Sequence, residues 1–60
     1  MSTAEQQLTV VVLKELDAAI DYIIDARTSI SHGNALDAAH FIEVAIAQLR
    51  AALVGIGGTS

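Results

Sequence analysis

The sequence predicts an all-α fold: an antiparallel helical hairpin that assembles as a homodimeric four-helix bundle. Two apolar stripes with helical spacing, joined by one short turn, predict the hairpin. Composition predicts the assembly, because 53% of the 60 residues are hydrophobic and there is no cysteine to form a disulfide. A chain this short buries little apolar surface by itself, so the apolar excess favours association with a second copy.

The first predicted helix covers about residues 3–31, a range that contains neither glycine nor proline. Ser2 and Glu5 have the spacing of a capping box at its start. Three consecutive valines, residues 10–12, lower the helix propensity locally, but the long helical periodicity outweighs them. The apolar stripe of this helix consists of Leu8, Val12, Leu16, Ala19, Ile23, Ala26 and Ile30.

Residues 32–34 are predicted to form the turn. Gly33 suits the left-handed position that ends a helix, and Asn34 suits the N-cap of the next helix. Asp37 then lies in a first helical turn, where the helix dipole favours negative charge. A connection this short makes the two helices antiparallel neighbours.

The second predicted helix covers about residues 35–54, with Gly55 as its stop and residues 55–60 as a frayed tail. It is apolar around most of its circumference, which is typical of a buried helix. Since it is shorter than the first helix, residues 5–9 are expected to overhang it. Its stripe consists of Ala35, Ala38, Ile42, Ala45, Leu49, Ala52 and Ile56. Residues 1–60 are therefore expected to form a single domain.

We expect the two stripes to supply the interface between copies. The side chains assigned to this interface are Leu16, Ile23, Ile30, Ile42, Leu49, Ala38, Ala45 and Ala52.

Three basic side chains are candidates for an ion pair or a ligand contact: Arg27, His40 and Arg50. Arg27 lies at the edge of the apolar stripe, where a cation needs either a carboxylate of the second subunit or an anionic ligand. Asp37, His40 and Glu43 share one helical face, but this face lies away from the stripe. We therefore expect the trio to face water rather than a metal, and we expect no cofactor.

Charge narrows the classes of partner. The formal net charge is −4, with one lysine and two arginines as the fixed cations. This charge disfavours nucleic acid and anionic membrane surfaces. Asp17, Asp21 and Asp25, each one turn from the next, predict a solvated acidic ridge. No uncharged apolar run is long enough to span a bilayer, so we expect a cytoplasmic protein.

These observations predict a small, non-enzymatic protein–protein interaction module that acts as an adaptor, inhibitor or scaffold. Its expected partners are a second copy of itself and another protein. The alternative is an oligomer that sequesters a small anionic ligand in grooves between subunits, through Arg27 or Arg50.

Overall fold

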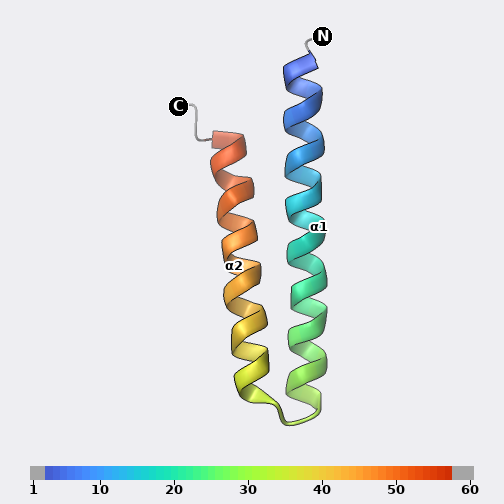
Figure 1. The fold of residues 1–60 in the computed structure, drawn as a ribbon, viewed down its shortest axis with the longest axis vertical. Helices are drawn as coiled ribbons and strands as arrows, with labels where there is room; N and C mark the ends of the chain where they lie inside the picture. The colour runs from blue at the N-terminus through green and yellow to red at the C-terminus, as the bar shows by residue number, and fades with distance from the viewer. Residues whose placement is uncertain (1–2, 58–60) are drawn as a thin grey trace.

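The computed structural model describes residues 3–57, which form two helices lying side by side in opposite directions (Figure 1). Helix α1 spans Thr3–Ser31 and helix α2 spans Ala35–Gly57. The Cα positions extend over 48 × 18 × 9 Å, so the molecule is a single layer of two helices. The predicted all-helical hairpin is confirmed.

The turn ends α1 through backbone hydrogen bonds. The Asn34 amide donates to the Ser29 carbonyl at 2.8 Å, and the Gly33 amide donates to the Ile30 carbonyl at 3.0 Å. This pair of bonds is a Schellman motif, which requires a left-handed residue at its centre. Gly33 supplies it with a φ of 78°. The carbonyl of Asn34 accepts the first bond of α2, from the amide of Ala38, so Asn34 occupies the predicted N-cap position.

The contact between the helices is made of small side chains. The buried residues are Val12, Ala19 and Ala26 in α1, and Ala38, Ala45 and Ala52 in α2. Both sets recur once per heptad, which keeps each set on one line along its helix. No large side chain among the described residues is fully buried. The hairpin therefore has a narrow, alanine-rich seam rather than a core.

The register of the seam follows from the contact of Gly55 with α1. Gly55 approaches both Leu8 and Val12 and so lies between them in height. Counting back along both helices sets Val12 about level with Ala52 and Ala19 about level with Ala45. Val12 indeed lies against the end of α2, where a Cβ added to Gly55 would come within 3.3 Å of its Cγ2.

The prediction that Gly55 ends the second helix is wrong, because α2 continues to Gly57. Gly55 instead lies where the two helices approach closely, and its missing side chain leaves room for Val12 and Leu8. The predicted tail is thus helical over residues 55–57, and residues 58–60 lie outside the described range. The same extension shortens the predicted overhang of α1, since Leu8 and Thr9 line a hollow together with Ile56.

The start of α1 includes the three valines in helical conformation, as predicted. The predicted capping box of Ser2 and Glu5 lies outside the residues whose side chains are described. At the other end of α1, the hydroxyls of Thr28 and Ser31 donate to the carbonyls of Ile24 and Arg27 at 3.1 and 2.9 Å, which adds hydrogen bonds to the last turns.

Candidate interface: an exposed apolar face

Both helices direct large aliphatic side chains to the same side of the hairpin. In each helix, the residues one and four positions after a buried residue lie on one flank of the seam. Because the helices are antiparallel and both right-handed, these two flanks belong to the same face. We call it the apolar face, and its large side chains are Leu13, Leu16, Ile20, Ile23 and Ile30 of α1 and Ile42, Ile46, Leu49, Leu53 and Ile56 of α2.

Nothing within the described chain covers this face. Leu16 is half-buried, and each of the other large side chains is between 42% and 68% exposed. The wide side of the hairpin, including its charged border, extends over 48 × 18 Å between Cα atoms. Soluble monomers rarely leave so many large aliphatic side chains exposed side by side.

The side chains assigned to the interface from sequence fall into two groups. Ile23, Ile30, Ile42 and Leu49 are exposed on the apolar face, with the half-buried Leu16 beside them. Ala38, Ala45 and Ala52 are only 1–3% exposed, because they pack in the seam against α1 of the same chain. Those alanines are therefore already covered before any second copy binds.

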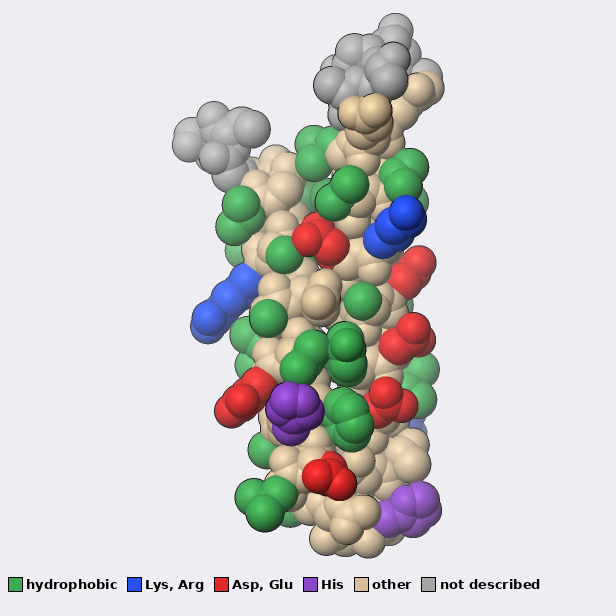
Figure 2. Space-filling model, viewed as in Figure 1, with side chains coloured by type: hydrophobic (Ala, Val, Ile, Leu, Met, Phe, Trp, Pro, Cys, Tyr) green, Lys and Arg blue, Asp and Glu red, His purple; other side chains and the backbone are tan. Residues whose placement is uncertain are grey.

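The opposite side of the hairpin has a different chemistry. Acidic side chains follow the outer side of α1, and a histidine lies among hydrophobic side chains between the helices (Figure 2). The two aromatic side chains of the protein meet on this side, with the rings of Tyr22 and Phe41 stacked at 6.4 Å between centroids. His40 is exposed, with its ring 6.0 Å from that of Phe41. His40 therefore lies away from the apolar face, as its position in the sequence predicted.

Arg27 lies on the apolar face, beside a shallow hollow. The hollow has a volume of about 370 Å³ and is lined by Ile23, Ala26, Arg27, Ile30, Ser31 and Ile42. Arg27 and Arg50 are both exposed, and neither forms an ion pair with any side chain that the structure describes, those of residues 6–57. The carboxylate predicted to pair with Arg27 belongs to a second subunit, and no described side chain of its own chain takes that place.

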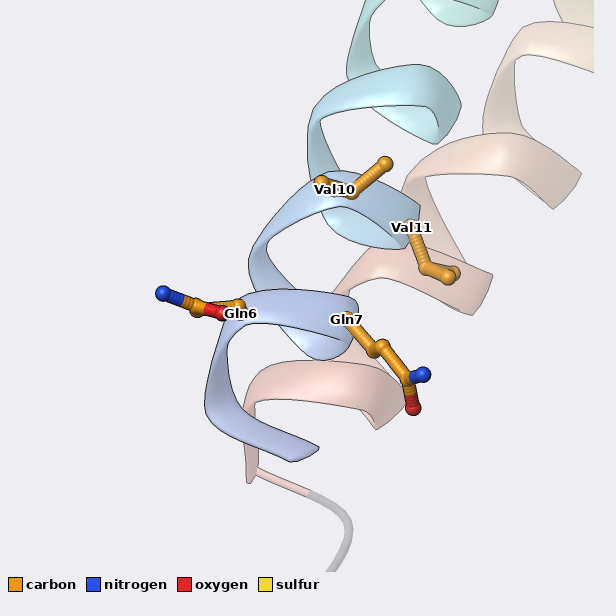
Figure 3. A pocket seen from close by; sticks show the side chains of 4 residues that line it. All are labelled: Gln6, Gln7, Val10 and Val11. Carbon is orange, nitrogen blue, oxygen red and sulfur yellow. The ribbon is translucent and has the colours of Figure 1, made fainter. Parts of the chain in front are cut away.

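The other hollows bring no reactive groups together. One hollow, of about 420 Å³, is lined by Gln6, Gln7, Val10 and Val11, all from the first turns of α1 (Figure 3). Gln6 and Gln7 point to different sides, so their amides do not converge on a common point. Among residues 6–57, whose side chains the structure describes, no three histidine or carboxylate side chains are grouped closely enough to hold a metal ion, and Asp37, His40 and Glu43 form no such site.

By length and composition, α2 could cross a membrane, since its most apolar stretch has a mean hydropathy of 1.5. This finding weakens the expectation that no segment of the chain could span a bilayer. That expectation counted only runs without any charged residue, whereas the apolar stretch of α2 contains a few charged residues. The apolar character of α2 is therefore open to two explanations, a lipid environment or a protein partner on the apolar face.

Comparisons with protein families, with curated proteins and with solved structures find no match to this chain.

Proposed function

We propose that this chain is a non-enzymatic protein–protein interaction module that acts as a homodimeric four-helix bundle. The observation that supports this function is the apolar face, whose exposed large aliphatic side chains continue across both helices. A two-helix hairpin can bury only the sides that its helices turn to each other. A second hairpin covers the rest, and a two-fold dimer is the most frequent way to do so.

In this dimer, the surface left for another protein is the acidic and aromatic side of each hairpin. The net charge of −4 per chain favours a partner with a basic surface, such as the protein that an adaptor, inhibitor or scaffold would hold. The half-buried, stacked rings of Tyr22 and Phe41 add apolar contact area to that surface.

A cytoplasmic location fits this function better than a membrane. Helix α2 packs along α1 through three buried alanines, so α1 would have to enter the bilayer with it. Helix α1 carries Lys14, Glu15, Asp17, Asp21 and Asp25 over its middle turns. Each of these charges would cost about 2.5–3.5 kcal/mol at the centre of a membrane-spanning helix, so a second hairpin covers α2 at lower free-energy cost than lipid.

The test is the mass in solution, measured by light scattering over a range of concentrations. We expect a species of twice the 6.3 kDa chain. Ile20→Lys places a charge on the apolar face without touching the seam, and should raise the dissociation constant at least tenfold. Val54→Lys is the matched control, because Val54 is 66% exposed but points away from the apolar face. A wild-type monomer at high micromolar concentration would overturn the proposal, as would equal effects of the two variants.

The alternative function, sequestering a small anionic ligand between subunits, is favoured by one observation. The hollow beside Arg27 combines apolar walls with an unpaired guanidinium, which suits the chemistry of a small apolar carboxylate. Calorimetric titration with octanoate tests it, with Arg27→Gln as the variant that should abolish binding. If the wild type and Arg27→Gln take up octanoate equally, or not at all, this alternative is excluded.

A further inference from the structure

We infer that the two copies pack with their turns at the same end of the bundle, so that the two-fold axis runs along the helices. This inference rests on the proposed dimer and adds its geometry. Two hairpins stacked through one face can be related in two ways. Either α1 of one copy lies over α2 of the other, with both turns together, or α1 lies over α1, with the turns at opposite ends. The shape of the hairpin permits both arrangements, so charge must decide between them.

Four charged side chains border or interrupt the apolar face: Asp17 and Arg27 of α1, and Glu43 and Arg50 of α2. Their positions relative to the apolar side chains place them there. Asp17, for example, lies one helical turn from Leu13 and one from Ile20, both of which belong to the apolar face. All four are exposed in the single chain, and none forms an ion pair with another described residue. Each would meet the second copy at the rim or within the interface, where like charges are costly and opposite charges set the register.

The register of the seam gives the height of each charge along the hairpin. Ala19 is level with Ala45, and Glu43 and Asp21 are each two residues from that pair, on the same side of it. Glu43 is therefore level with Asp21. By the same count from Val12 and Ala52, Arg50 is level with Lys14.

With the turns at the same end, opposite charges meet along each seam between copies. Asp17 of one copy lies about 4.5 Å along the axis from Arg50 of the second copy, at 1.5 Å per residue. Arg27 lies about 9 Å from Glu43 of the second copy, within reach of its long side chain. In antiparallel helices, side chains lean toward their own N-terminus, and here that direction brings both pairs closer together. Two-fold symmetry repeats both contacts, so all eight border charges of the dimer face an opposite charge.

With the turns at opposite ends, the pairing is poorer. Asp17 is the middle residue of α1, which spans Thr3–Ser31. Two fully overlapped antiparallel copies of α1 would therefore place Asp17 against Asp17 of the second copy. Glu43 would still approach Arg50 of the second copy, but Arg27 would be moved to the far end of the bundle, beside the first turns of α1. Like charges set directly opposite each other are destabilising, so this arrangement is disfavoured.

A distance measurement decides between the two arrangements. The chain has no cysteine, so His32→Cys gives one spin label per subunit, in the exposed turn. Turns at the same end place the two labels roughly 20–30 Å apart, a few interhelical spacings of 8–10 Å plus the linkers. Turns at opposite ends place them near the 48 Å length of the hairpin. A long distance in a dimer would overturn this inference alone, whereas a monomer would overturn the proposed function as well.

Charge reversal tests the same point with a change of sign. Asp17→Lys should weaken dimerisation on the order of tenfold in the inferred arrangement, because it sets the introduced ammonium of one copy against Arg50 of the second. With the turns at opposite ends, the same variant would remove one repulsion only to create another, so Arg50 would not influence its effect. Asp21→Lys is the matched control for net charge, since Asp21 lies on the outer side of α1. Adding Arg50→Glu to Asp17→Lys should restore dimerisation, and failure to restore it would contradict the pairing.

Discussion

At the scale of single residues, the size of the side chain decides where it lies in this hairpin. The seam uses alanine at five of its six buried positions and valine at the sixth. Small side chains let two helix backbones approach closely, so large neighbours are displaced to the flanks. The ten large aliphatic side chains of the apolar face are therefore left for a contact outside the hairpin.

The two stripes predicted from sequence contain all six seam residues but only six of the ten large side chains of the apolar face, and they do not separate the two groups by size. The four side chains missing from the stripes are Leu13, Ile20, Ile46 and Leu53. A stripe with +3/+4 spacing is about 100° wide. Part of it packs against the other helix of the same chain, and the rest is left to pack against a second copy. The heptad spacing of Ala38, Ala45 and Ala52 was the signal that would have separated the two roles. Alanines repeated at one heptad position mark a close approach, whereas Ile42 and Leu49, one turn away, require a wider space.

Enlarging a side chain in the seam should destabilise the fold. Ala45 is 3% exposed, so Ala45→Leu must separate the helices or distort their side chains, at a cost of about 1–3 kcal/mol. Ala47→Leu makes the same chemical change on the exposed outer side of α2 and should alter the free energy of unfolding by less than about 0.5 kcal/mol. Chemical denaturation monitored by circular dichroism measures both variants. Equal stability of the two would show that the seam is not close-packed.

At the scale of helices, the two glycines that sequence reasoning treated as stops behave differently. Gly33 ends α1 because its left-handed φ closes a Schellman motif. Gly55 lies inside α2, where the contact with Val12 and Leu8 leaves little space for a larger residue. A glycine near a helix end is consistent with either role, and only the position of the other helix distinguishes them. The end of α1 and the start of α2, by contrast, depend on local capping and were predicted correctly.

A matched pair of alanine substitutions tests the role of the turn. Gly33→Ala forces an L-residue into a left-handed conformation and should cost about 1–2 kcal/mol of stability. Gly57→Ala is the control, because Gly57 is helical and a Cβ there would meet nothing within 4 Å. That variant should be neutral or stabilising by up to about 1 kcal/mol, since alanine favours the helix. A smaller loss of stability at Gly33 than at Gly57, measured by thermal unfolding, would contradict the left-handed turn.

At the scale of the whole molecule, the proposed dimer makes folding and association a single process. One hairpin buries only a seam of small side chains, and most of the stability of helices in proteins comes from the packing of an amphipathic face. Most of the apolar area available to stabilise the fold lies on the apolar face. We therefore expect that covering this face supplies much of the free energy of folding, as in obligate dimers that have no stable monomer.

Stability should then depend on protein concentration. Each tenfold dilution removes about 1.4 kcal/mol from the free energy of a dimer, so the melting temperature should fall by roughly 5 °C. Leu49→Asp, which places a carboxylate on the apolar face, should unfold the chain as well as dissociate it. A melting temperature that stays constant over a hundredfold dilution, or a folded monomer of Leu49→Asp, would mean that the alanine seam alone holds the hairpin. The nine exposed aliphatic side chains of the apolar face would then have to be explained by a different protein that binds them.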